Sequence, residues 1–199
     1  KLEKDQQGSF ETDIIIGIYH LKNSKFDISN KYFLKAKNRN SVSILDNYIA
    51  ETLYIWSNLR NQNLEKSKLN LNQLDSRFTN LKKIQNAFLH CFYNSPSTDQ
   101  LFKNLISGNQ IDFSRYNYFH AKYLDSIGSK NEAAKIIEES LKQYPRNLLL
   151  NQYKDDQVNL KNSFEFDCKK ENHVAAELLY IGANAVSYTH LTLPTTMLV

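Results

Sequence analysis

The chain has 199 residues, of which 41% are hydrophobic, and a formal net charge of +4 at neutral pH. This length suits one domain with a substantial core or several stacked repeats, and the small net charge gives no indication of nucleic-acid binding. No run of about 20 apolar residues occurs, so we expect no transmembrane helix. With only five glycines and three prolines, the composition also argues against a turn-rich all-β fold.

The first predicted element is a helical hairpin within residues 10–43. It follows a polar N-terminal remnant, residues 1–9, which begins with lysine, whereas the only methionine is Met197. We therefore expect the native start to be missing, so the lack of a signal peptide is uninformative. Gly17 places a small residue midway along the first helix, and Phe33 belongs to a helically spaced apolar set in the second.

Two further hairpins are predicted within residues 44–111. Residues 44–78 contain an apolar first helix at 49–59 and a second helix at 63–78. Residues 79–111 form a more degenerate copy, in which Pro96 and its flanking serines mark the turn between helices.

The clearest hairpin lies within residues 112–147. Small residues, Ala121 and Ala133, occur where two helices must approach closely, and Gly128 lies between them at a position suited to positive φ. The second helix has a single apolar stripe and ends before Pro145, because proline cannot continue a helix.

This hairpin resembles the tetratricopeptide repeat (TPR), a helix–turn–helix unit of about 34 residues. The spacings of the family are matched in order by Gly128, Ala133, Ile137, Ser140 and Pro145. The usual tryptophan is absent, and His120 stands where leucine is usual. The residues opening successive second helices are 38, 34 and 32 residues apart: Ser29, Ser67, Leu101 and Ala133. The resemblance implies an all-α, right-handed superhelix of TPR-like repeats; generic helical hairpins are the alternative.

Residues 148–185 are predicted to hold a helix, a loop and the start of a further repeat. The segments 8–36 and 173–185 resemble parts of alphaproteobacterial TPR proteins. That resemblance implies a bacterial, exported and periplasmic protein, with the cytoplasm as the alternative location.

Residues 186–199 differ in kind from the rest. The stretch 186–196 has no charge and no helical periodicity, and it resembles a translated transposase sequencing adapter. We therefore expect the helix before it to break, native protein to end near Ala185, and the chain to be a metagenomic fragment. A natural apolar β-strand tail is the alternative.

No catalytic, cofactor or metal site is predicted. The histidines lack metal-ligand spacing and are expected on helix surfaces or partly buried, and no hydrolase elbow or phosphate-binding loop occurs. Cys91 and Cys168 have no nearby thiol, so we interpret them as ordinary small apolar side chains rather than a disulfide or metal ligands.

The function predicted from the resemblance is non-catalytic: a scaffold or adaptor whose concave groove binds a peptide or a partner helix. Candidate groove residues come from two first helices: Thr52, Trp56, Leu59 and Arg60, then Arg115, Tyr118, Lys122 and Asp125. Trp56 with Arg60 forms the strongest candidate anchor pair, although Trp56 fits packing between repeats equally well. Arg115 with Lys122 fits a carboxylate clamp or a solvated face.

Two other functions remain open at this point. A helical array that binds RNA would need a basic groove, whereas acidic and basic residues are interspersed here, so no nucleic acid is expected. The chain also fits the repeat region of a larger enzyme whose catalytic domain lies elsewhere.

Overall fold

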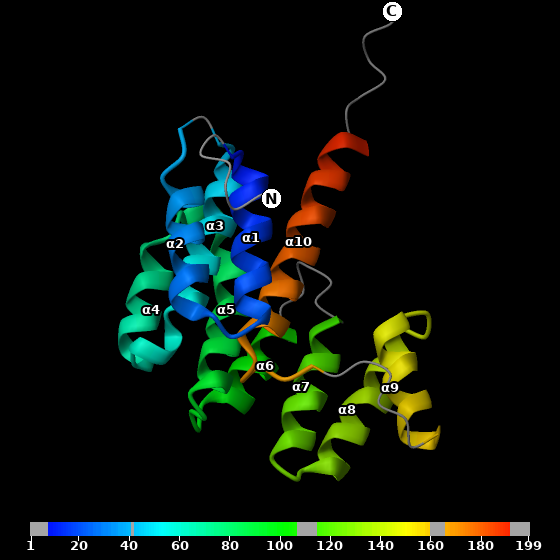
Figure 1. Cartoon of the computed structure of the whole chain (residues 1–199). Helices are drawn as coiled ribbons and strands as arrows, with labels where there is room; N and C mark the ends of the chain where they lie inside the picture. Colours follow the sequence, from blue (N-terminus) through cyan, green and yellow to red (C-terminus); the bar gives the residue numbers. More distant parts are fainter. Residues whose placement is uncertain (1–7, 41, 107–114, 160–165, 192–199) are drawn as a thin grey trace, which may run out of the picture. The chain divides into compact units, whose positions relative to one another are not determined.

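The computed structural model describes residues 8–40, 42–106, 115–159 and 166–191, and this part of the chain contains helices and no strand (Figure 1). The all-α prediction is therefore confirmed. None of the helices in these ranges has the length and apolarity needed to cross a bilayer. The α-helices are Phe10–Lys22 (α1), Phe26–Lys37 (α2), Ile44–Ser57 (α3), Leu64–Gln73 (α4), Thr79–Phe92 (α5), Thr98–Ile106 (α6), Arg115–Ser126 (α7), Lys130–Gln143 (α8), Leu148–Asn159 (α9) and Glu171–Leu191 (α10).

The helices divide between two compact units. Unit 1 comprises residues 1–78 and 171–199, and therefore contains α1 to α4 together with α10. Unit 2 comprises residues 79–170 and contains α5 to α9. In sequence, unit 2 is thus an insertion between two parts of unit 1.

Local hydrogen bonds fix where the helices of unit 1 begin. The Ser9 hydroxyl accepts from the backbone N–H of Thr12 at 3.2 Å at the start of α1. At the start of α3, Ser43 and Asp46 form a capping box in which each side chain accepts from the backbone N–H of the other. Such caps satisfy N–H groups that have no partner inside the helix.

The first hairpin is held by a close approach at Gly17. A Cβ placed there would lie 2.4 Å from the Cε1 atom of Phe33, so only glycine leaves room for this ring. The Ser29 hydroxyl donates to the Gly17 carbonyl at 2.9 Å and joins the two helices beside the ring. Gly17 lies midway along α1 and Phe33 on the buried face of α2, as the spacing predicted, and the structure brings the two together.

Helix α10 packs against α1 and α3 within unit 1 (Figure 1). A Cβ at Gly182 would lie 2.7 Å from Ile49 Cδ1, which shows how closely α10 approaches α3. The sequence indicated only that a helix forms here; its packing against helices more than 100 residues earlier was not predicted.

The expected helix break at Ala185 does not occur, because α10 continues to Leu191. The prediction was wrong because it relied on the lack of charge and periodicity, neither of which ends a helix. Glycine and proline do so most strongly, and neither occurs between Val186 and Leu191. The adapter-like origin of the tail is a separate prediction that the helix does not test.

Unit 2 is a succession of helices in which α5 packs on α6, α6 on α7, and α7 on both α8 and α9. Its aromatic core centres on Phe88, whose ring contacts those of Phe102, Tyr116, Phe119 and Phe166. The turn between α7 and α8 has Gly128 at φ +85°, as the sequence predicted. Helix α8 ends at Gln143, before Pro145.

The predicted end of the second helix in the hairpin of residues 44–78 was wrong. Helix α4 ends at Gln73 rather than at Phe78, because Leu74 adopts an extended backbone (ψ 161°) and the chain then forms a short 3-10 helix, Ser76–Phe78. The buried side chain of Leu74 keeps the apolar pattern going past the end of the helix, which misled the periodicity.

Candidate binding site

Three of the candidate groove residues lie inside the protein. Thr52, Trp56 and Leu59 are at most 1% exposed, so the prediction that they line an open groove is wrong. Helix α3 packs against α2, α4 and α10, which leaves little of its surface free. The alternative interpretation of Trp56, as a packing residue, is the one that agrees with its burial.

Arg60 is more exposed, but its guanidinium already interacts with two residues of unit 1, Glu171 and Phe26. Its guanidinium Nε donates to Glu171 Oε1 at 2.7 Å and its Nη2 to Oε2 at 3.3 Å, while the group lies 4.3 Å from the centre of the Phe26 ring. The hydrogen bond to Glu171 raises the pKa of the Arg60 guanidinium further. Arg60 therefore ties α10 to unit 1 and is a poor candidate for a partner anchor.

The candidate residues of α7 separate into two groups. Tyr118 is buried, with its ring edge-on to Tyr153, and burial raises the pKa of its hydroxyl. The half-buried Arg115 has its guanidinium 5.5 Å from the centre of the Phe119 ring. Lys122 lines a cleft that Arg115 does not line, so the two residues do not form the predicted clamp around it.

Lys122 and Asp125 line a cleft of about 340 Å³ in unit 2. One wall is α7, and the other is the non-helical segment 166–169 that precedes α10. The complete lining is Phe119, Lys122, Tyr123, Asp125, Ser126, Phe166, Asp167, Cys168 and Lys169. Two of the eight predicted residues are therefore brought together, and the second wall was not predicted.

The aspartates in the cleft accept hydrogen bonds, whereas Lys122 forms no ion pair with the described residues. Asp125 Oδ2 accepts from the Tyr153 hydroxyl at 2.9 Å, and Asp167 Oδ1 accepts from the backbone N–H of Lys169 at 2.8 Å. Lys122 is half-buried, and its ammonium has no ion pair in the described part of the chain. The cleft therefore holds Lys122 and Lys169 beside two carboxylates that already accept hydrogen bonds, and the ammonium of Lys122 pairs with neither of them.

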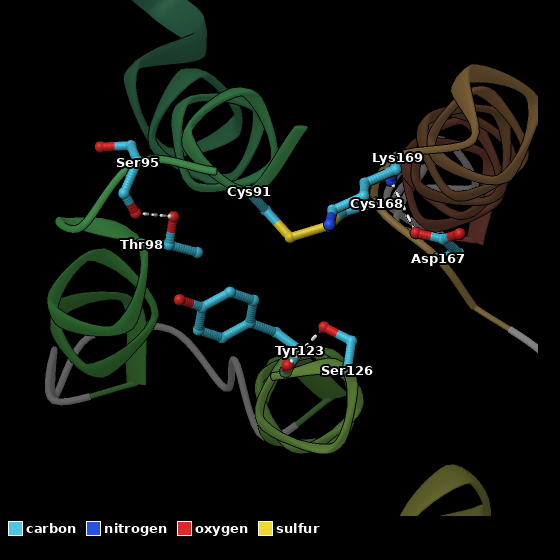
Figure 2. Close-up of a disulfide and its surroundings, with 8 residues drawn as sticks. All are labelled: Cys91, Ser95, Thr98, Tyr123, Ser126, Asp167, Cys168 and Lys169. Carbon is cyan, nitrogen blue, oxygen red and sulfur yellow. Dashed lines mark hydrogen bonds between the residues drawn. A yellow bond between two sulfur atoms is a disulfide. The ribbon is translucent and has the colours of Figure 1, made fainter. Parts of the chain in front are cut away.

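A disulfide holds the second wall in place. Cys91 of α5 is bonded to Cys168, with their Cα atoms 5.9 Å apart (Figure 2). The sequence interpretation of these residues as unpaired apolar side chains is wrong, and neither cysteine is free. They are 77 residues apart, so nothing local in the sequence could have shown that they meet. Their even number was the only available signal.

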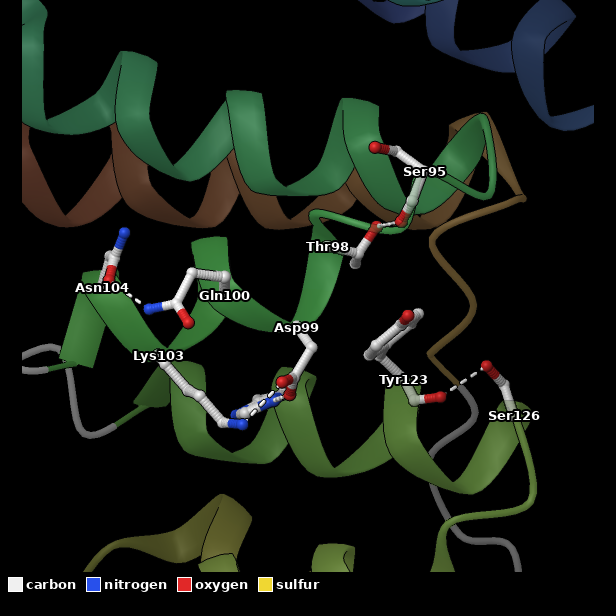
Figure 3. Close-up of polar contacts among 9 residues, drawn as sticks. Ser95, Thr98, Asp99, Gln100, Lys103, Asn104, Tyr123 and Ser126 are labelled. Atoms are coloured by element: carbon white, nitrogen blue, oxygen red, sulfur yellow. Dashed lines mark hydrogen bonds and ion pairs between the residues drawn. The ribbon is translucent and has the colours of Figure 1, made fainter.

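A second polar cluster lies between α6 and α7. His120 Nε2 is 2.8 Å from Asp99 Oδ1, and Lys103 pairs with the other oxygen of the same carboxylate (Figure 3 shows Asp99 and Lys103). His120 is fully buried and stacks on Phe102, which corrects the prediction of a surface or partly buried histidine. Its Nδ1 has no hydrogen-bond partner in the described residues and no contact with solvent.

This cluster has the parts of an acid–base pair, and His120 and Lys103 line a second cleft of about 340 Å³, but the Nδ1 atom of His120 is buried. Burial lowers the pKa of His120, against the opposing effect of the hydrogen bond to Asp99. Burial raises the pKa of Asp99, but the hydrogen bonds from Lys103 and His120 outweigh it and the pKa is lowered. The neutral imidazole therefore donates Nε2–H to an ionised carboxylate. A base must reach the proton it removes, and here Nδ1 is enclosed, so we interpret the cluster as structural.

No metal site is found in the described ranges, since they contain no group of three histidine, cysteine or acidic side chains arranged to hold an ion. Comparison of the chain with protein-family models, curated proteins and solved structures gives no match. The geometry of the cleft is therefore the basis for assigning a function.

Proposed function

We propose that this protein is a non-catalytic binding module that holds a carboxylate-bearing peptide in the cleft between α7 and residues 166–169. The observation that carries the proposal is the half-buried ammonium of Lys122 in that cleft, which forms no ion pair with the residues that the structure describes. A half-buried lysine whose ammonium forms no ion pair can attract an anion, and a carboxylate forms a charge-assisted hydrogen bond with it.

The rest of the cleft supports a peptide as the carrier of that carboxylate. Its volume of about 340 Å³ fits part of a short extended peptide rather than a folded partner. Tyr123 and Phe166 provide apolar surface, and the Ser126 side chain offers a hydroxyl, which already donates to the Tyr123 carbonyl. Aromatic surface beside a few placed polar groups is usual in ligand sites.

The helical hairpins support a proposal about the evolutionary origin of the protein, and the disulfide supports one about its cellular compartment. The close helix contacts at Gly17, Ala121 and Ala133 support a TPR-like origin, in which helices of bacterial repeats form a binding scaffold. The disulfide supports an oxidising compartment, which agrees with the export implied by the family resemblance. Both remain part of the proposal.

The test uses the oxidised, purified chain and synthetic peptides in matched pairs. Each pair differs only in a free or amidated C-terminus, or in glutamate against glutamine, and binding is measured by fluorescence polarisation. We expect peptides with the carboxylate to bind more tightly than their neutral partners. Lys122→Gln should lower their affinity about tenfold at low salt, the effect of one charge-assisted hydrogen bond.

Lys142 provides the matched control, because it is an exposed lysine of unit 2 outside the cleft. Lys142→Gln should leave the affinity unchanged. Equal binding by both members of every peptide pair, or equal losses in the two variants, would refute the proposal. Steep salt-dependent binding to mixed RNA would instead favour an RNA-binding array, and a downstream hydrolase or transferase domain in the full-length gene would favour the enzyme alternative.

A further inference from the structure

The second wall of the cleft is joined to the helices of unit 2 by a ring contact and by a disulfide. Residues 166–170 form no helix; local bonds hold the turn, in which Lys170 N–H donates to the Asp167 carbonyl at 3.0 Å. Phe166 and Cys168 provide longer-range attachments to the helices. The Phe166 ring lies 4.4 Å from that of Phe119 and 5.3 Å from that of Phe88, and Cys168 is bonded to Cys91.

Of these attachments, the disulfide is covalent, and one of its two cysteines lines the cleft. Cys168 itself lines the cleft, next to Asp167 and Lys169 of the same wall (Figure 2). A crosslink between residues 77 apart removes much of the freedom that this segment would otherwise have. The position of three lining side chains is thus tied to the oxidation state of one bond.

We propose that the Cys91–Cys168 disulfide is a redox control of the cleft: the oxidised form fixes its second wall for binding, and reduction releases the wall and weakens binding. The inference rests on the proposed function for its ligand, but the release of the wall can be measured without any ligand. The cellular reductant would be a dithiol oxidoreductase, and dithiothreitol reproduces its chemistry.

The exchange begins at Cys168, because that residue lines the cleft and is 5% exposed, whereas Cys91 does not line it and is 2% exposed. A thiolate of the dithiol attacks Cys168 Sγ, the bond to Cys91 Sγ breaks, and Cys91 leaves as a thiolate that takes up a proton. The second thiol of the reductant then attacks its own mixed-disulfide sulfur, which frees Cys168 as a thiol and closes the reductant's disulfide. The protein gains two electrons and two protons, and the dithiol loses both.

Hydrogen exchange provides the ligand-free test. Amides of residues 166–170 should exchange at least about tenfold faster in the reduced protein, while those of α7 and α8 keep their rates. The variant Cys91→Ala/Cys168→Ala should behave like the reduced protein and should not respond to dithiothreitol. Unchanged exchange in the wall would overturn the inference, since Phe166 packing would then suffice. Loss of protection throughout unit 2 would also overturn it, because the bond would be needed for folding.

The binding test uses the carboxylate peptide identified with the oxidised chain. Reduction should lower its affinity about tenfold or more, because the ordering of the wall must then accompany binding. Equal affinity in both redox states would overturn the redox control and leave the peptide-binding function standing. Absence of binding by the oxidised chain would instead refute the proposed function itself, so the two failures are distinguishable.

Discussion

The ring of Phe33 occupies the space that a side chain at Gly17 would need, with Cε1 only 2.4 Å from the position of a Cβ. Phe33 is fully buried, so the ring cannot move aside without displacing its neighbours. This contact fixes the approach of α1 to α2 and makes unit 1 sensitive to a single methyl group.

Gly17→Ala should therefore destabilise unit 1 by about 1–3 kcal/mol through overpacking, despite the roughly 1 kcal/mol by which alanine favours a helix over glycine. Urea unfolding followed by fluorescence of Trp56, the only tryptophan and a buried residue of unit 1, measures the change. Gly182→Ala is the control: its Cβ would meet the tip of Ile49, which can rotate away, so a smaller loss is expected. A gain in stability for Gly17→Ala would contradict the close contact.

The ion pair of Arg60 with Glu171 should contribute measurably to unit 1. Arg60→Met leaves the carboxylate of Glu171, 4% exposed, without its cation, and should cost about 1–2 kcal/mol. The estimate is below that for a fully buried pair because the Arg60 side chain is 57% exposed. The same urea titration applies.

The pair of Arg77 with Asp75 is the matched control, since both of its side chains are more accessible than Glu171. Arg77→Met should change the free energy of unfolding by less than about 0.5 kcal/mol. Equal losses for Arg60→Met and Arg77→Met would show that burial of Glu171 does not matter. In the double variant Arg60→Met/Glu171→Gln, part of the loss should be recovered.

Ala133 should tolerate no enlargement, because it is fully buried in the contact of α8 with α7. Ala133→Leu should lower the stability of unit 2 by about 1–3 kcal/mol, measured by circular dichroism during urea unfolding. Ala134→Leu changes the next residue, which is exposed, and should shift stability by less than about 0.5 kcal/mol. Similar curves for the two variants would count against close packing of α8 on α7 at Ala133.

His120 should make unit 2 sensitive to mild acid. Burial places the pKa of His120 below the value of about 6.5 that it has when unfolded. The unfolded state then binds the proton more strongly than the folded state does. The stability that the neutral His120 contributes is therefore complete above pH about 6.5, and it is lost as the pH falls from that value toward the lower pKa of His120 in the folded protein.

His120→Gln keeps a donor toward Asp99 but cannot titrate, so the free energy of unfolding should depend less on pH between about 7 and 5. Asp99→Asn retains the histidine and should retain the acid sensitivity in that range. Urea titrations at each pH measure both variants. Identical pH profiles for His120→Gln and the unaltered chain would rule out His120 as the source.

Local patterns explain which parts of the fold were predictable. Gly128 and Pro145 act within a turn or two of the chain, through positive φ and the end of a helix, and Gly17 meets Phe33 on the next helix of the same hairpin, so sequence spacing reveals them. The candidate site was predicted only in part, because Lys122 and Asp125 lie on one helix whereas the opposite wall is brought in by a disulfide over 77 residues.

The sequence by itself determined the helical class and the hairpins, since periodicity of apolar residues and turn residues are local properties of the chain. The tertiary structure alone decided that α10 packs on α1 and α3, that Thr52, Trp56 and Leu59 are buried, and that Cys91 meets Cys168. The physical reason is that an apolar stripe shows that one face of a helix will be covered, but not which distant segment covers it. That choice belongs to the packing of the whole unit, and it also places the second wall of the cleft beside Lys122.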